Sequence, residues 1–520
     1  MAEKKDFAQG EQAAIARDVS RQGEWIPMID WSSVFPGNRG VNRHGKYELH
    51  DVPVGVRLSI QEATKHIILT ADQEWDGDTP GKAEYVPLKA WKDKDKYKLL
   101  YITCPRRTKN PGLSGTSPPH LCYAISTDGY TWDRPDLGQV EWNGSKNNNM
   151  IANAPTGTPF EDPGAPPEQR FKAIGQVGAH IDPDTGEKID PDEAYTRWKK
   201  QEQLGDKYTG PKMTSLHWVE GWTSPDGIHW KSIGKVGDMS SDGGSAAQYD
   251  PETNSYYAYI RVGGAGRRAT GLARTKDFWK WPEADLVLFP DPQDSPDVSF
   301  YGTSYFQYPT NPDLHCAFVE IYHQLADNND TQIAFSKNMT HWVRPERKPI
   351  IPNGSLGNPD SAGARPWGGL IELSDGNWAT VYRGQQNLHN YRDSEPVTAF
   401  KPGVLMLGIW KPHRFCSVEA PTEGRFTIPT VQPSKKELRL NFHCKTGGFI
   451  KAELVAGIPS RIHPDAEAIP GFSFDESEIL TGDHLNKTVS WNGNSDISKL
   501  GDSIAIRIQM FQAKLFAYSI

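Results

Sequence analysis

Three aspartates could supply acid and base chemistry because each comes shortly before a segment with the pattern of a β-strand. Asp76 precedes a predicted strand at 84–90, Asp162 precedes one in the next part of the chain, and Asp242 precedes one at 245–249. Carboxyl groups brought together in one pocket can act as a general acid when protonated and as a general base or nucleophile when ionised. Each aspartate is also followed by Gly or Pro, so each would equally serve to cap a turn.

A second group of residues could bind a polar substrate. Arg261 and Arg383 each end a predicted strand, although salt bridges between neighbouring sheets would explain both. Glu320 interrupts an apolar strand, where a carboxylate often has a functional role. An outward-facing position on the strand would explain it equally well. The candidate substrate-binding residues, several of which ordinary packing would explain, are Glu161, Arg261, Tyr301, Glu320, His323, Arg365, Trp367, Arg383 and His389. The reserve carboxyl groups are Asp78, Glu84, Glu161, Asp297 and Glu320.

The composition restricts the class of partner. The net charge is −8 and the pI is about 6.0, whereas nucleic-acid binding needs a basic face. The sequence has no run of 18 apolar residues and no basic run, so a membrane is not expected as a partner either. The 17 Trp and 19 Tyr favour an all-β chain and offer flat surfaces on which sugar rings stack. A carbohydrate is therefore the expected partner, and the oligomeric state is left open.

The N-terminal residues and the cysteines bear on location. The first residues, MAEKKDFAQGEQ, are polar and lack the apolar core of a signal peptide. We expect a cytoplasmic protein, or a secreted or periplasmic one from which a signal peptide has been removed. The five cysteines show no zinc-binding spacing. Buried free thiols are favoured over a disulfide between Cys104 and Cys122.

A recurring hairpin motif predicts the architecture. In each copy a Ser or Thr is followed two residues later by Asp or Asn and six residues later by Trp. The Asp or Asn would bond the turn backbone, and the Trp would open the returning strand and pack between sheets. The copies are at 126–132, 224–230, 275–281 and 336–342, with a degenerate fifth at 409–415 that ends in Phe.

The strands around the motif complete a repeating unit. An aromatic-rich strand precedes each hairpin, at 96–103, 170–174, 255–262, 315–322 and 377–383. A further strand before each of these gives four strands per unit and five units, which is typical of a five-bladed β-propeller. A polar insertion at 178–212 should project at one rim as a loop or a short helix.

The repeat stops near residue 421. Alternating segments separated by Gly, Asp and Asn turns follow it and predict a β-sandwich. The fold class is therefore all-β. The predicted domains are an N-terminal extension at 1–50, the propeller at 51–420 and the sandwich at 421–520.

These parts resemble the five-bladed propeller glycoside hydrolases of families 32, 43 and 68, especially relatives with a family-32-like C-terminal sandwich. The likeness covers roughly 50–520 and is carried by the segments CYAISTDGYTWDRPDLG, TPFEDPGAPPEQRFKAI, SPDGIHWKSIG, DGGSAAQYDPETNSYYAYIR and GDHLNKTVSWNG. The chain departs from the family in lacking the Trp-Met-Asn-Asp-Pro-Asn-Gly motif and the Glu-Cys acid motif. Glu161-Asp162-Pro163 is a loose counterpart of the family's Arg-Asp-Pro element. The resemblance therefore does not identify the sugar.

The resemblance does imply roles for the three aspartates. Asp76 would be the base or nucleophile, Asp162 would orient the sugar, and Asp242 would take the place of the acid, which is Glu in relatives. The implied activity is hydrolysis of a furanoside or related glycan without a redox cofactor, and some relatives bind Ca²⁺ near the axis. A non-catalytic carbohydrate-binding or scaffolding propeller is the alternative, and lyase or transferase chemistry is a third hypothesis.

Overall fold

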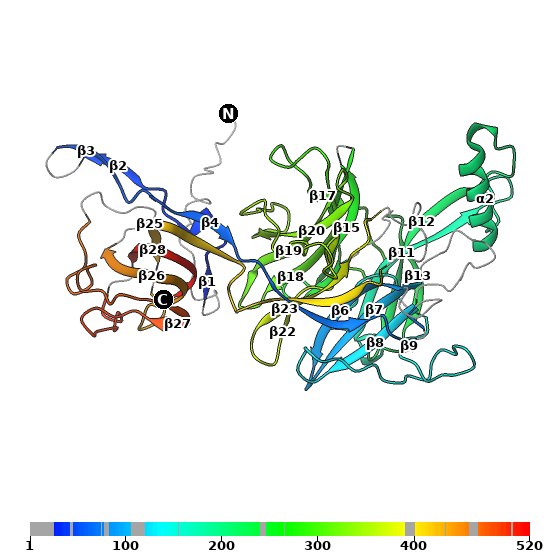
Figure 1. The fold of residues 1–520 in the computed structure, drawn as a ribbon, viewed down its shortest axis with the longest axis horizontal. Coiled ribbons are helices and arrows are strands. Elements are labelled where there is room, and N and C mark those ends of the chain that lie inside the picture. The colour runs from blue at the N-terminus through cyan, green and yellow to red at the C-terminus, as the bar shows by residue number, and fades with distance from the viewer. Residues whose placement is uncertain are drawn as a thin grey trace, which may run out of the picture.

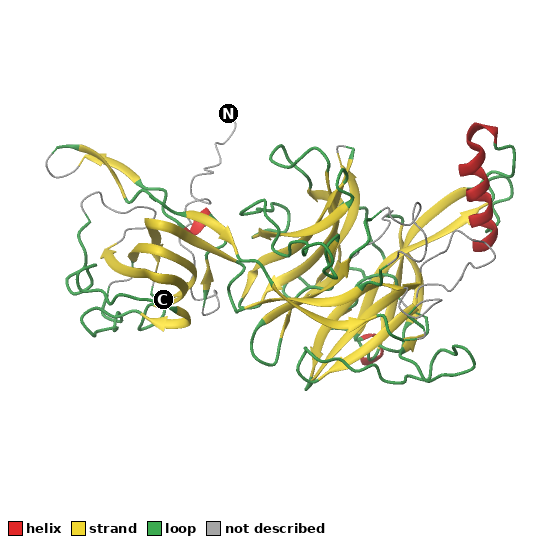
Figure 2. Cartoon of the chain, in the orientation of Figure 1, coloured by secondary structure: helices red, strands yellow, loops and turns green. Residues whose placement is uncertain are grey.

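The computed structural model describes most of the chain, and its regular secondary structure is almost entirely β-strand. The described residues are 25–41, 45–73, 75–76, 83–105, 120–153, 155–239, 246–264, 266–389, 401–431, 433–456, 466–500 and 503–520. Within these ranges the helical elements are α2 (Pro191–Leu204), η1 (Trp31–Ser33), η2 (Pro167–Gln169) and η3 (Gly205–Lys207). The other regular elements are strands that pair mainly in antiparallel sheets and are joined by loops (Figures 1 and 2).

Three sheets of four antiparallel strands follow one another along the chain. The first contains β6 (Ala83–Asp93), β7 (Lys96–Pro105), β8 (His120–Ser126) and β9 (Met150–Ile151). The second contains β10 (Phe160–Glu161), β11 (Phe171–Ile181), β12 (Thr214–Ser224) and β13 (Lys231–Gly237). The third contains β14 (Ala246–Asp250), β15 (Ser255–Gly264), β16 (Arg267–Thr275) and β17 (Asp285–Leu288). These are the first three blades.

The fourth and fifth blades share one larger sheet. The fourth is formed by β18 (Val298–Tyr308), β19 (Asn311–His323) and β20 (Asn328–Ser336). The fifth is formed by β21 (Gly363–Pro366), β22 (Ile371–Glu372), β23 (Trp378–Gln385), β24 (Val404–Trp410) and the early strand β5 (Thr64–Thr70). One parallel pair, Asn329 with Gly363, joins the two blades.

Hydrophobic clusters between consecutive blades show that the five sheets close into a ring. Each of five clusters takes buried side chains from two neighbouring blades, and the last cluster joins the fifth blade back to the first. Representative pairs are Leu100 with Phe171, Ile174 with Ala258, Tyr259 with Tyr305, Phe318 with Trp410, and Leu405 with Tyr85. The predicted five-bladed propeller is confirmed.

This packing explains why many blade strands are apolar on both faces. A blade has a neighbour on each side, so both faces of its central strands lose contact with water. Every residue of β23 is buried, and so are most residues of β20. Burial of this kind supplies the main stabilisation of the ring.

The N-terminal strand β5 completes the fifth blade. It pairs antiparallel with β24, with Thr70 opposite Val404 and Thr64 opposite Ile409. The nearby Lys65 Nζ forms an ion pair with the buried Asp360 carboxylate at 2.6 Å. β5 therefore covers the edge of β24 and becomes the outermost strand of the fifth blade.

The recurring hairpin motif forms the predicted turn in all four intact copies. In the first, the Asp128 carboxylate accepts hydrogen bonds from the backbone N–H groups of Tyr130 and Thr131, at 2.7 and 2.8 Å. The Trp132 indole then donates to the Gly129 carbonyl at 2.8 Å. The same indole-to-carbonyl bond recurs for Trp230, Trp281 and Trp342. The repeat is therefore a repeated set of local hydrogen bonds.

The polar insertion lengthens the second blade. Strands β11 and β12 pair continuously from Phe171 opposite Ser224 to Ile181 opposite Thr214. Their distal half is partly or fully exposed, and α2 extends beyond it, away from the ring (Figure 1). The prediction of a projecting short helix in this insertion is confirmed.

The C-terminal region is a β-sandwich made from one bent sheet. Its strands are β25 (Cys416–Val431), β26 (Arg439–Ala456), β27 (Asp483–Thr488) and β28 (Ile504–Ser519). Register shifts interrupt β25 and β26 midway. The two halves of the bent sheet contribute to one core, in which Ile508 and Leu515 are both buried.

Residues from the N-terminal part of the chain also belong to this sheet. Strand β1 (Ile26–Pro27) pairs with β28, and β4 (Arg57–Ile60) pairs with β25. The predicted boundaries, which placed 1–50 in an extension and 51–60 in the propeller, are corrected accordingly. A hairpin of β2 (Asn38–Val41) and β3 (Tyr47–His50) projects from this side of the molecule (Figure 1).

The described cysteine side chains are buried thiols. Cys122, Cys316, Cys416 and Cys444 are free, so the bridge from Cys122 to Cys104 is not formed. Burial raises the pKa of Cys122 well above its usual value. Among the described residues, no helix has the length and apolar character needed to cross a membrane.

Loss of a turn carboxylate should destabilise the propeller by a measurable amount. We expect Asp128→Ala to lower the free energy of unfolding by about 1 kcal/mol, because two backbone N–H groups lose their acceptor. Asp136→Ala, at an exposed position in the same blade, is the matched control and should change it little. Denaturant unfolding measures both, and equal stability of the two variants would contradict the assigned role of the turn.

Candidate functional site

The innermost strands of the blades define two faces of the ring. Strand β18 begins at Val298 opposite His323, where β19 ends, and β21 begins at Gly363 opposite Gln385, where β23 ends. We call this side, where the innermost strands begin, the N-terminal face. The opposite side, which carries the turn between β6 and β7, is the C-terminal face.

Tyr301 is the centre of a cluster on the N-terminal face. It sits in a β-bulge, because Phe300 pairs with Ile321 and Gly302 pairs with Glu320 while Tyr301 has no opposite residue. A bulge redirects the side chain of the extra residue. Here the Tyr301 hydroxyl forms a hydrogen bond with His389 Nε2 at 2.9 Å.

Three arginines from two other blades surround the Tyr301 ring. The guanidinium carbons of Arg261, Arg268 and Arg365 lie 4.4, 4.9 and 5.0 Å from the ring centroid. Arg261 also donates to the Tyr301 carbonyl at 2.9 Å. Cations at these distances are attracted by the electron-rich ring. The aromatic ring thus holds several positive charges close together.

Glu320 places one buried carboxylate beside these arginines. Its exposed fraction is 1%. Oε1 is 2.5 Å from Arg365 Nε and accepts a 2.9 Å hydrogen bond from Asn329 Nδ2. Oε2 has no hydrogen-bond partner among the described residues. The carboxylate is therefore held through one oxygen, while the other is buried without a hydrogen-bond partner among the described residues.

Gly302 leaves room for Glu320 and Trp367 to approach each other. A methyl group at Gly302 would lie 3.0 Å from Glu320 Oε2 and 3.2 Å from Trp367 Nε1. A larger residue there would press on both side chains. We call Arg261, Arg268, Tyr301, Glu320, Arg365 and His389 the Tyr301 cluster, and Trp367 borders it.

Two further predicted binding residues, His323 and Arg383, lie on the same face as this cluster. Arg383 is buried, stands opposite Arg365 in the β21–β23 register and donates to the Gln385 side chain. His323 Nε2 is 2.9 Å from the Asp330 carboxylate, and this hydrogen bond raises the pKa of His323. Asp297, one of the reserve acids, accepts hydrogen bonds from Ser295 and from the backbone of Leu325.

Asp76 also lies on the N-terminal face, in an enclosed position. Its side chain has an exposed fraction of 0%. Oδ2 accepts hydrogen bonds from the Tyr85 hydroxyl at 2.6 Å and the Gln73 N–H at 3.0 Å. Oδ1 has no partner among the described residues. Burial raises the pKa of this carboxyl group.

Asp162 lies on the opposite face, which the sequence did not predict. It follows the short innermost strand β10, and Arg170 on the returning chain contacts both Glu161 and Asp93. Asp93 ends β6, whereas Asp76 contacts Tyr85 near the start of β6. At about 3.3 Å per residue, the eight residue steps from Tyr85 to Asp93 along the strand span roughly 25 Å. The prediction that Asp76 and Asp162 share one pocket is therefore wrong.

The negative charge of Asp162 is also compensated by a neighbouring lysine. Its Oδ2 is 2.6 Å from Lys172 Nζ and 2.7 Å from the Tyr256 hydroxyl, in a buried setting. Glu161 pairs with Arg170 at 2.8 Å on the same face, so it lies apart from the Tyr301 cluster. Asp242, Asp78 and the side chain of Glu84 lie outside the described residues.

The sequence did not single out several residues of the site. Arg268 and Asn329 were missed, although the pair Arg267-Arg268 directly follows the Gly-rich turn at 263–266. The bulge at Tyr301 has no signal in the sequence because it depends on the register of β19. No group of three or more His, Cys, Asp or Glu side chains is placed to hold a metal ion in the described part of the chain.

Comparison with known proteins gives matches among solved structures only. No family model and no curated protein matches the chain. It is similar to a structure titled "Glycoside hydrolase" (10% identity, TM-score 0.39, 69% of this chain and 93% of that one). It is also similar to a family 32 β-fructofuranosidase of Bombyx mori (10%, 0.37, 88% and 94%). A third is a family 117 glycoside hydrolase of Zobellia galactanivorans (13%, 0.35, 68% and 90%).

The enclosed Asp76 carboxyl group should impose a pH dependence on stability. A pKa that is higher in the folded state means that stability falls as the pH rises from about 4 toward the folded value. We expect Asp76→Asn to keep the bonds from Tyr85 and Gln73 and to unfold at neutral pH no earlier than wild type. The two proteins should converge below about pH 4 in thermal unfolding.

Asp72→Asn is the matched control with the opposite sign. Burial of Asp72 is outweighed by its hydrogen bonds to Gln73 and Arg134, which lower its pKa. Its stabilising contribution should be present at neutral pH and lost as the pH falls below about 4. A lower unfolding temperature of Asp76→Asn at neutral pH would contradict the assigned burial cost.

Proposed function

We propose that the protein is a glycoside hydrolase whose active site is the Tyr301 cluster on the N-terminal face. The observation that carries the proposal is Glu320, a buried carboxylate fixed by Arg365 and Asn329 through one oxygen. Its other oxygen is unpartnered among the described residues. A positioned carboxylate of this kind is what glycosidic bond cleavage requires of its base or nucleophile.

Glu320 would act as the ionised carboxylate of the pair. Arg365 neutralises its charge, and Gly302 places no side chain against the unpartnered oxygen. Hydrolysis then needs a proton donor on the same face. Asp76 has the raised pKa that suits a donor, in place of the base role implied by the family resemblance. Because Asp76 is enclosed, Asp242 is the alternative donor.

An aromatic side chain supports a sugar as substrate. Trp367 is half-buried beside Glu320, and a flat ring of this kind stacks on the apolar faces of sugars. A furanoside or related glycan is the substrate class implied by the resemblance, and the reaction needs no redox cofactor. A turnover assay repeated in the presence of EDTA tests whether bound calcium contributes to activity.

A non-catalytic carbohydrate-binding propeller is the second candidate. It is favoured by the separation of Asp76 and Asp162 on opposite faces and by the Lys172 ion pair that occupies Asp162. Under this candidate the Tyr301 cluster would bind a glycan without turning it over. Both candidates place the ligand at the same site.

Glu320→Gln separates the two candidates. The glutamine keeps the shape of the side chain, so we expect folding and glycan binding to persist while kcat falls by about 10²- to 10⁴-fold. Chromatography of products from a panel of furanosides and plant or microbial glycans measures turnover. Glu161→Gln, on the C-terminal face, is the matched control and should keep wild-type turnover.

The outcomes discriminate clearly. Wild-type turnover in Glu320→Gln would overturn the proposed active site. Glycan binding by wild type without any product after long incubation would establish the binding propeller instead. Product mass separates hydrolysis, which adds water, from elimination, which does not.

A further inference from the structure

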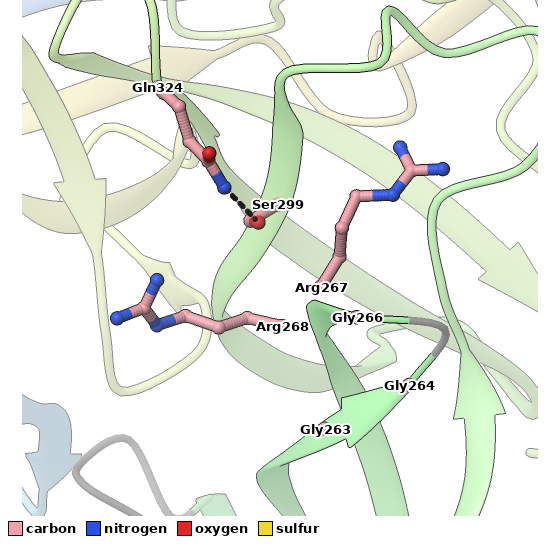
Figure 3. Close-up of a pocket in the computed structure, with 7 residues that line it drawn as sticks. All are labelled: Gly263, Gly264, Gly266, Arg267, Arg268, Ser299 and Gln324. Carbon is pink, nitrogen blue, oxygen red and sulfur yellow. Dashed lines mark hydrogen bonds between the residues drawn. The ribbon is translucent and has the colours of Figure 1, made fainter.

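A pocket next to the Tyr301 cluster is lined by hydrogen-bond donors and has a volume of about 390 Å³. Its wall comes from the β15–β16 turn and from the starts and ends of the fourth-blade strands. The lining residues are Gly263, Gly264, Gly266, Arg267, Arg268, Ser299 and Gln324 (Figure 3). Figure 3 shows the two arginine side chains diverging from β16, with Ser299 and Gln324 between them.

Among the described residues, the lining contains two positive charges and no carboxylate. Arg267 donates only long bonds of 3.4 Å to the carbonyls of Ser295 and Val298. Arg268 contacts the Tyr301 ring at 4.9 Å and makes no ion pair with a described residue. Gln324 donates to Ser299 Oγ at 3.2 Å, which leaves the Ser299 hydroxyl proton free to be donated. The pocket therefore offers donors with few acceptors.

Arg268 connects this pocket to the proposed active site. Its side chain lines the pocket, and its guanidinium also contacts the Tyr301 ring, which is contacted in turn by Arg365, the ion-pair partner of Glu320. These contacts would link a ligand in the pocket to the carboxylate. The pocket is thus placed to hold a part of the same substrate.

We propose that the pocket binds an anionic group of the glycan, a carboxylate, sulfate or phosphate, at the guanidinium of Arg268. This inference rests on the proposed function and specifies its substrate class. Arginine binds planar or tetrahedral oxyanions through paired N–H donors, and such charge-assisted bonds are about twice as strong as neutral ones. The glycine wall allows a sugar to approach the backbone closely.

Equilibrium binding of simple probes tests the proposal. Calorimetric or NMR titration compares glucuronate and galacturonate with glucose and galactose, and inorganic sulfate and phosphate with chloride. We expect the anionic probes to bind and the neutral sugars to bind about tenfold more weakly or not at all. Preference for uronates identifies a carboxylate, and preference for sulfate or phosphate identifies the corresponding ester. Equal binding of acidic and neutral sugars would overturn the proposal.

Two variants test the pocket by independent routes. Arg268→Gln removes one charge and should weaken anion binding about tenfold or more. Arg274→Gln removes the same charge from the exposed, opposite end of the same strand and should not change binding. Gly263→Leu adds an apolar side chain to the pocket wall without a change of charge, and its Cβ would meet no atom within 4 Å. Unchanged anion binding in both Arg268→Gln and Gly263→Leu would contradict the site.

The anion-binding pocket and the proposed glycosidase activity can be rejected independently of each other. Hydrolysis of neutral glycosides that depends on Glu320, without anion binding, would retain the glycosidase and reject this pocket. Anion binding that depends on Arg268, without any glycoside cleavage, would retain the pocket and reject the glycosidase. Thermal unfolding of each variant shows that a loss of binding is not a loss of folding.

Discussion

The pairing of β5 with β24 is the interaction on which the rest of the structure depends. It joins residues 64–70 to residues 404–410 and supplies the outer strand of the fifth blade from the other end of the propeller. Without it, β24 would present an open edge, and the core between the fifth and first blades would lose Leu69. The cluster that contains Leu69, Leu405 and Tyr85 shows that strand pairing and core packing close the ring together.

Ring closure brings residues that are distant in sequence to one face. Arg261 and Arg268 come from the third blade, Tyr301 and Glu320 from the fourth, and Arg365 from the fifth. None of these blades could form the cluster alone. The bulge at Tyr301 turns one aromatic ring toward three cations, and that ring then organises the charges around Glu320. The site is therefore a consequence of how the blades converge.

Much of the fold could be predicted because local hydrogen bonds define the hairpin turn that recurs in the blades. The Asp or Asn of each hairpin motif bonds its own turn, and each Trp bonds a carbonyl three residues earlier. Such contacts depend only on neighbouring residues, so their spacing counts the blades. The strand β5 carries no motif of this kind. Its place in the fifth blade depends on a partner more than three hundred residues away and could not be predicted.

The candidate site was predictable in part for the same reason. Arg261, Glu320 and Arg365 were chosen for their places at strand ends or in an apolar strand, and the structure brings them together. Asp162 was misplaced because the innermost strand β10 is only two residues long. The sequence therefore gave no indication that the strand ends before Asp162, and one strand length separates the two faces.

Hydrogen exchange of the closing strands tests ring closure most directly. Under native conditions we expect the amides of 64–70 and 404–410 to exchange as slowly as those of the central strand β7. All three segments should exchange through one cooperative opening of the ring. Mass spectrometry of the corresponding peptides resolves these segments. Fast exchange of 64–70 while β7 remains protected would show that β5 does not close the propeller.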